Sequence, residues 1–186
     1  TVMSTVSELE KEINAKNYIQ AFNTIKEIGK NAYHQNNPYG KYLFRNATAK
    51  LYFDQGDNAM AEKNYRMAIE TAESSLPNID TGDDYLGLAR CLDKLTRRSE
   101  GIDLLNKGIN KVNTDKSRAQ LYVQLGKMLY WEKRYDDYIN NYNNAKKYFG
   151  REINSGQSSF MTVIKELISG NTEKAEKEAM SIKNWE

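Results

Sequence analysis

A small residue recurs at a regular interval along this chain, each time shortly after a predicted turn. Positions 21, 61, 101, 138 and 175 follow one another at 37 to 40 residues, and they hold Ala21, Ala61, Gly101, Tyr138 and Ala175. Tyr138 is the exception, and its bulk predicts a different local packing. A constant period of this length is typical of a chain built from repeated supersecondary units, because one unit cannot bury its apolar face alone.

The clearest unit runs from position 42 to position 75 and predicts two helices joined by a tight turn around Gly56. A glycine there allows the left-handed conformation in which many helices end. Small, aliphatic and aromatic residues recur three or four positions apart on both sides of this turn, which is helical spacing. They are Leu43, Ala47, Ala49 and Tyr52 before the turn, and Ala61, Tyr65 and Ala68 after it.

This unit resembles a tetratricopeptide repeat, whose first helix carries a small residue and then Tyr, and whose second helix carries Ala, an aromatic residue and Ala. The matching residues are Ala49, Tyr52, Gly56, Ala61, Tyr65 and Ala68. A second match, over 116–150, contains Leu125, Gly126 and Ala145. The resemblance implies an all-α fold, a right-handed α-solenoid of about five helix-turn-helix repeats. The interval exceeds the usual repeat length of about 34 residues and looks like that of peptide-sensing bacterial regulators and repeat-containing sensor proteins.

We therefore expect one repeat domain over residues 1–186, with repeats at about 4–35, 40–76, 83–113, 116–150 and 157–184. Ser7 and Glu10 have the spacing of a capping box at the start of the first helix. Residues 36–40, which contain Pro38, predict a break between the first two repeats. An irregular helical bundle is the alternative fold.

Composition disfavours two classes of function. The formal net charge is +2, the sequence pI is near 8.4, and no block of about five or six like charges occurs, whereas nucleic-acid-binding domains usually cluster their Lys and Arg. No stretch reaches the roughly 18 uncharged apolar residues of a spanning helix, so we expect no membrane insertion. The single cysteine, Cys91, follows the apolar rhythm of Leu88 and Leu92 and is predicted to be buried. The sequence leaves the compartment open: the cytoplasm is slightly favoured over a periplasmic or extracytoplasmic sensor segment.

We also expect no catalysis, no cofactor and no metal site. His34 is the only histidine, so the chain lacks a His pair for a metal. The acidic pairs at 83–84 and 136–137 are adjacent in sequence, so the two side chains of each pair point apart on a helix, and helix ends explain them better than acid–base chemistry. Neither a phosphate-binding glycine-rich loop nor a nucleophilic serine flanked by glycines is present.

The resemblance implies that the first helices of the repeats line a concave groove. Corresponding positions on these helices hold Glu10, Lys50, Arg90, Lys127 and Ile164. We predict that the three consecutive cations form a row that holds carboxylates. Their neighbours complete the predicted peptide-binding groove: Asn46, Phe53, Gln124, Tyr130 and Trp131. The alternatives are ordinary solvated helix surface for the cations and packing for the aromatic residues.

The main hypothesis is therefore a non-catalytic module that binds a protein or peptide, as the sensing or interaction segment of a larger signalling or regulatory protein. Its partner is expected to carry acidic groups or a free carboxylate. The alternative is a structural assembly subunit or scaffold with a permanent protein interface of roughly 2,000 Å² or more. We also expect self-association through the C-terminal end, where Trp185 lacks a polar helix to cover it.

Overall fold

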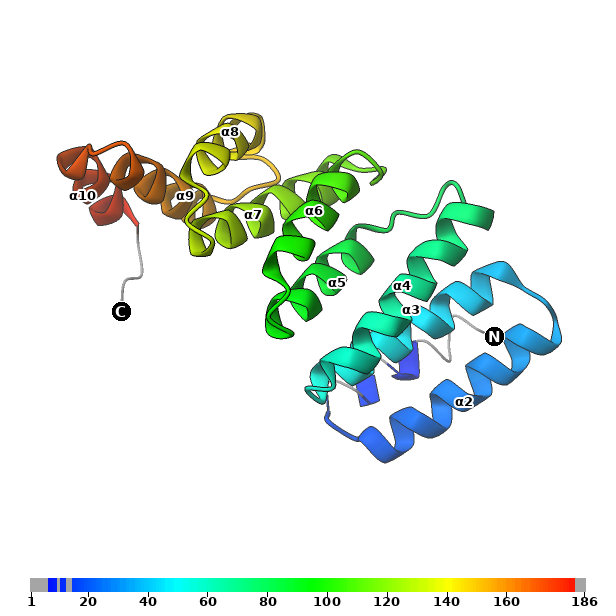
Figure 1. Ribbon diagram of the computed structural model, residues 1–186. Helices are drawn as coiled ribbons and strands as arrows, with labels where there is room; N and C mark the ends of the chain where they lie inside the picture. The colour runs from blue at the N-terminus through cyan, green and yellow to red at the C-terminus, as the bar shows by residue number, and fades with distance from the viewer. Residues whose placement is uncertain (1–6, 10, 13–14, 183–186) are drawn as a thin grey trace. The chain divides into compact units, whose positions relative to one another are not determined.

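The computed structural model describes residues 7–9, 11–12 and 15–182, and this part of the chain is all-helical apart from one bridge between Phe149 and Ile153 (Figure 1). Residues 7–9 and 11–12 are helical and precede the first labelled helix. The helices that follow are α2 (Tyr18–His34), α3 (Pro38–Asp54), α4 (Asn58–Ser75), α5 (Gly82–Lys94), α6 (Arg98–Ile109), α7 (Asp115–Trp131), α8 (Tyr135–Ala145), the 3₁₀ turn η1 (Lys146–Tyr148), α9 (Ser155–Ile168) and α10 (Thr172–Ser181). The all-α prediction is confirmed.

The turns inside the five predicted helix pairs share one backbone feature. Each contains a residue with positive φ, and these residues lie 40, 40, 37 and 37 positions apart at Lys16, Gly56, Thr96, Lys133 and Gly170. Their φ angles range from 56° to 85°. The small residue of the repeat, or Tyr138 in its place, follows five positions later each time. The period read from the sequence is therefore also a period of backbone conformation.

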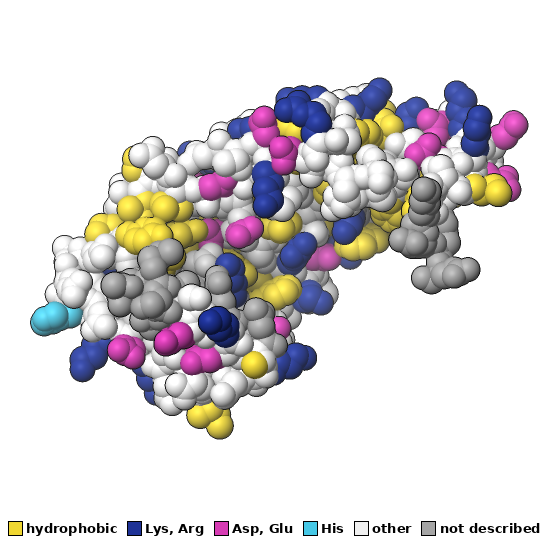
Figure 2. All heavy atoms as spheres, turned by 180° about the vertical axis from the view of Figure 1, so that it is seen from behind, with side chains coloured by type: hydrophobic (Ala, Val, Ile, Leu, Met, Phe, Trp, Pro, Cys, Tyr) yellow, Lys and Arg dark blue, Asp and Glu magenta, His cyan; other side chains and the backbone are white. Residues whose placement is uncertain are grey.

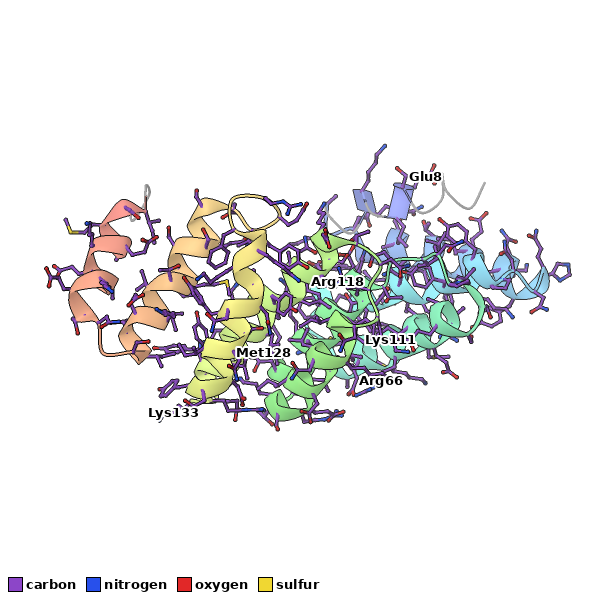
Figure 3. The ribbon with its side chains drawn as sticks, turned by 90° about the horizontal axis from the view of Figure 1, so that it is seen from above. Glu8, Arg66, Lys111, Arg118, Met128 and Lys133 are labelled. Atoms are coloured by element: carbon purple, nitrogen blue, oxygen red, sulfur yellow. The ribbon has the colours of Figure 1, made fainter. Side chains whose placement is uncertain are left out.

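The chain divides into two compact units, unit 1 over residues 1–97 and unit 2 over residues 98–186. In unit 1, α3 packs against both α2 and α4, and α4 packs against α5. In unit 2, α7 packs against α6 and α8, and it also contacts α9, which packs against α10 (Figure 3). The predicted single array over 1–186 concerns how the units join, and it stays a prediction.

Small residues let the helices approach closely. Ala21 and Ala61 have no exposed surface, Gly101 is buried, and Ala175 is 2% exposed. Tyr138, the predicted exception, is also buried, and its hydroxyl donates a hydrogen bond of 2.8 Å to the carbonyl of Met161. This large side chain therefore joins α8 to α9 instead of leaving their packing loose.

Asparagine side chains cap the starts of α3 and α9, and α3 begins earlier than the sequence predicted. The predicted break at 36–40 is too long, because α3 already begins at Pro38 with Asn37 as its N-cap. Proline at the first helical position loses no helical hydrogen bond. Asn154 and Gln157 form a capping box at the start of α9. Glu10, the other half of the box predicted at Ser7, lies outside the described residues.

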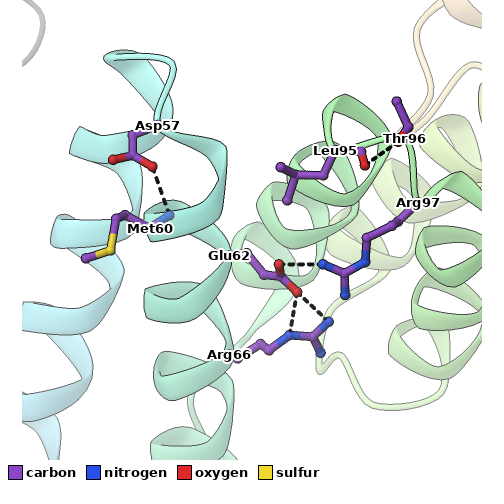
Figure 4. Close-up of polar contacts among 7 residues, drawn as sticks. All are labelled: Asp57, Met60, Glu62, Arg66, Leu95, Thr96 and Arg97. Carbon is purple, nitrogen blue, oxygen red and sulfur yellow. Dashed lines mark hydrogen bonds and ion pairs between the residues drawn. The ribbon is translucent and has the colours of Figure 1, made fainter.

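A small ionic cluster holds the end of unit 1. Glu62 on α4 pairs with Arg66, at 2.9 Å, and with Arg97 just after α5, at 2.7 Å (Figure 4). Asp57 caps α4 by accepting a hydrogen bond from the backbone amide of Met60. Exposed ion pairs contribute little individually, so we regard the cluster as fixing the turn after α5 rather than stabilising the whole unit.

Candidate functional site

Unit 2 contains a hollow between the first helices of its last two pairs, which we call the α7–α9 groove. Its volume is about 300 Å³, and its main lining residues are Val123, Gly126, Lys127, Phe160, Met161 and Ile164. Tyr138 of α8 also lines it. The volume is at the lower end of ligand pockets, and it suits one large side chain of a partner rather than a whole cofactor.

Gly126 is the residue around which this groove forms. A Cβ there would lie 3.3 Å from Asn141 Nδ2 and 3.6 Å from Met161 Cε, so α7 sits close to both α8 and α9. Tyr138 is held beside it by its hydrogen bond to Met161. The groove wall is therefore set by buried contacts, and it does not depend on a loop.

The groove is mostly apolar with a cationic edge. Val123, Met161 and Ile164 are buried, whereas the Phe160 ring is 48% exposed at the surface. Lys127 is exposed, and none of the described carboxylates forms an ion pair with it. An apolar floor beside an uncompensated ammonium group can bind an apolar side chain next to a carboxylate.

The repeat register explains why these residues meet. Val123 and Phe160 lie 37 positions apart, as do Lys127 and Ile164, so each pair occupies equivalent places on α7 and α9. The sequence reasoning aligned Lys127 with Ile164, and the structure brings both into one groove. Phe160 was missed, although the same offset leads from Val123 directly to it.

The other residues predicted on α7 lie outside this groove. Gln124 is 7% exposed and faces the core of unit 2. Tyr130 and Trp131 are 38% and 48% exposed at the C-terminal end of α7. Trp131 stacks with the Arg98 guanidinium, 5.4 Å from its ring, and Tyr130 packs against the Tyr135 ring. Each of these aromatic residues thus has a neighbour within unit 2.

The residues predicted in unit 1 divide between exposed and structural positions. Arg90 is exposed, and Lys50 and Phe53 are partly buried. Asn46 instead donates a hydrogen bond of 2.7 Å to Asp84 on α5. The proposed row through Lys50, Arg90 and Lys127 runs across both units, and it stays a prediction.

Asp84 is the most perturbed carboxyl group near these positions. It has no exposed surface and accepts hydrogen bonds of 2.7 Å from both Tyr42 and Asn46. Burial raises the pKa of Asp84 from 3.8 to about 6, and these hydrogen bonds together with the charge of Lys50 lower it only in part. The arrangement joins α3 to α5, so Asn46 serves packing within unit 1.

Residues of α2, α3 and α4 line a second hollow, which lies in unit 1. The sequence did not predict it. We call it the basic groove and define it by Lys26, Lys30, Tyr33, Arg45, Tyr52 and Lys63. Its volume is about 570 Å³. No predicted site residue lines it, because α2 and α4 are the second helices of their pairs.

The described residues offer little else for chemistry. No group of three or more His, Cys, Asp or Glu side chains among them could hold a metal ion. Cys91 is buried, as predicted, and its burial raises the pKa of the thiol to about 12. None of the described helices has the length and apolar character needed to cross a membrane.

The face of the molecule drawn in Figure 2 carries charged side chains of both signs. Lys and Arg alternate with Asp and Glu on the visible face, and hydrophobic side chains gather in separate patches. This face therefore lacks the extended area of one sign that is the usual footprint of nucleic-acid binding.

Comparison with known proteins adds no identification. No protein-family model matches this chain, and no curated protein matches its sequence.

Proposed function

We propose that this chain is a tetratricopeptide-like repeat module, a right-handed α-solenoid that acts by binding and has no catalytic site of its own. Two observations support the repeat type. Positive-φ turns recur at 37 and 40 residues, and the equivalent first helices α7 and α9 contact each other. Each helix pair then buries its apolar face against the next pair.

The function that the geometry supports best is recognition of a short segment of another protein in the α7–α9 groove. One observation supports this proposal most strongly. Residues at equivalent repeat positions of α7 and α9 line the same groove, and they include the exposed Phe160 ring and the Lys127 ammonium group. The bound segment would insert an apolar side chain against Met161 and Ile164. A carboxylate beside that side chain would meet Lys127 in a charge-assisted hydrogen bond.

A peptide-display selection on the intact chain tests this function. Short random peptides are selected on the wild-type chain, and the affinity of the enriched peptides is measured by calorimetry. We expect apolar residues next to acidic residues among them. Phe160→Ala and Lys127→Glu should each weaken binding by about tenfold or more, as expected for the central residues of an interface.

Matched controls exist on the same two helices. Leu167 is 51% exposed on α9, and Lys116 is exposed on α7, and neither lines the groove. Leu167→Ala and Lys116→Glu should leave the affinity unchanged. Equal losses at the groove and control positions, with helicity and melting preserved, would place the binding surface elsewhere and overturn the proposal.

A further inference from the structure

The basic groove of unit 1 combines three helices around an aromatic floor. Phe22, Lys26, Lys30 and Tyr33 come from one face of α2, where they follow helical spacing. Gly29 on this face lets α3 approach closely, because a Cβ there would lie 2.7 Å from the Phe44 ring. The contact between α2 and α3 is therefore tight at this point, and the hollow, at about 570 Å³, has room for more than one side chain.

The lining of this groove carries positive charge without a compensating carboxylate. Lys26, Lys30, Arg45 and Lys63 line it, and no Asp or Glu does; Glu27, on the same helix, lies outside the lining. The three lysines are exposed, and they form no ion pair with any residue that the structure describes. An anion would therefore enter without displacing a resident partner.

Arg45 is the best-positioned of these cations. Its Nη1 donates to Asn64 at 3.2 Å and its Nη2 donates to the Tyr33 hydroxyl at 2.9 Å, both neutral acceptors. Its buried Nε has no acceptor within the described part of the chain. A partly buried guanidinium group without a counter-ion is costly, and a carboxylate or other anion beside it would offset that cost.

The aromatic rings are arranged for side-chain contact and not for base stacking. The Arg45 guanidinium carbon lies 5.7 Å from the Tyr33 ring centre and 5.0 Å from the Phe44 ring centre, and Lys41 lies 5.1 Å from the Tyr33 ring centre. Phe22 and Tyr52 meet edge to face. Single-stranded nucleic acids need free ring faces on which bases can stack, and here the Arg45 guanidinium already lies over the Tyr33 and Phe44 rings.

We propose that the basic groove is a second binding site, which holds an acidic segment of a partner protein. An Asp or Glu side chain of that segment lies at Arg45 between Lys30 and Lys63. An adjacent apolar side chain of the segment packs on the Phe22 and Tyr52 rings. This inference rests on unit 1 alone and is independent of the α7–α9 groove.

The test measures binding of synthetic peptide pools to the full chain by fluorescence anisotropy. One pool alternates Glu with Phe or Leu, and a second pool carries Gln in place of every Glu. We expect the wild-type chain to bind the acidic pool about tenfold more tightly than the neutral pool, as for a few charge-assisted contacts. The double variant Lys30→Glu with Lys63→Glu should lose that preference.

The matched control is Lys16→Glu with Lys94→Glu, which changes the net charge of unit 1 equally at exposed positions outside the groove. It should retain the preference, and so should Phe160→Ala, which separates this site from the α7–α9 groove. An equal loss in the control double variant would overturn the proposal, because net charge alone would then explain binding. Tighter binding to single-stranded oligodeoxythymidylate or to phosphatidylserine vesicles than to the acidic pool would also overturn it.

Discussion

Titration of the Asp84 carboxyl group should change the free energy of unfolding of the chain with pH. Its carboxyl group is buried between α3 and α5, with Tyr42 and Asn46 as hydrogen-bond donors. Because desolvation raises its pKa to about 6 in the folded protein, the folded state binds a proton more tightly than the unfolded state, where the ordinary value is 3.8.

We predict that this residue makes the chain less stable as pH rises. Its favourable contribution is fully present below about pH 3.8 and is lost as pH rises through about 6. A shift of this size corresponds to a free energy of about 3 kcal/mol, as an order of magnitude. Carbon-detected NMR of the Asp84 carboxyl group gives the pKa directly, and urea unfolding at pH 4.5 and 7.5 gives the stability.

Two variants separate Asp84 from the other acidic groups. Asp84→Asn removes the titrating group. The free energy of unfolding of this variant should therefore change with pH differently from that of the wild type between about pH 3.8 and 6. Asp83→Asn removes an exposed neighbouring charge that helps to raise the pKa of Asp84, so the dependence should persist but over a slightly lower pH window. A measured pKa near 3.8 for Asp84 would contradict the desolvated environment described for it.

At the residue level, helical periodicity predicts the burial of apolar side chains more directly than the partners of polar ones. Cys91 was correctly predicted to be buried, because its apolar neighbours recur at helical spacing. Asn46 was predicted in a groove, yet its partner lies 38 residues away on another helix. Gln124 was predicted in the same groove, and its side chain is buried. Helical periodicity identifies the face of a polar side chain, but a tertiary hydrogen bond leaves no trace in the local pattern.

At the scale of elements, the pattern placed both the helices and the turns inside the helix pairs. Gly56 and Gly170 marked two of the turns, and both adopt positive φ. Lys16, Thr96 and Lys133 adopt the same left-handed conformation without being glycine. This conformation costs a non-glycine residue roughly 1–2 kcal/mol, so the sequence marks these three turns by the break in helical spacing and does not reveal their positive φ.

The packing of α4 against α5 depends on Gly87, which the sequence reasoning did not single out. A Cβ at this position would lie 2.3 Å from Tyr65 Cζ, and the Tyr65 side chain is buried, so the ring cannot move into solvent. We predict that Gly87→Ala destabilises the chain by about 1–3 kcal/mol through overpacking, although alanine has the higher helix propensity. Chemical denaturation measures this change.

Gly156 provides the comparison. A Cβ there would meet only Asn154 Oδ1 at 3.4 Å, which is ordinary contact, and the residue is exposed near the start of α9. Gly156→Ala should be neutral or slightly stabilising. If Gly87→Ala were equally neutral, α4 and α5 would be less closely packed than the structure shows.

On the scale of the whole molecule, the sequence predicted the all-α class and the order of the helix pairs. The repeat register aligned Lys127 with Ile164, and both line the α7–α9 groove, whose binding role stays a prediction. The sequence did not predict the basic groove, because the residues that line it come from α2, α3 and α4 and do not share one repeat position. The prediction of self-association concerned Trp185, which lies outside the described residues.

The central claim is that a segment of a partner protein binds in the α7–α9 groove of unit 2. Methyl NMR of the full chain, labelled at Ile, Val and Met, tests it most directly during titration with a peptide selected on the wild-type chain. Val123, Met161 and Ile164 report on the α7–α9 groove, whereas Ile25 and Met60 line the basic groove.

We expect the Val123, Met161 and Ile164 methyl signals to shift in a saturable way, with Ile25 and Met60 unchanged, and the Phe160→Ala variant to need about tenfold more peptide for the same shifts. A peptide that binds while these three signals stay in place, or that shifts signals of Ile25 and Met60 instead, would contradict the account.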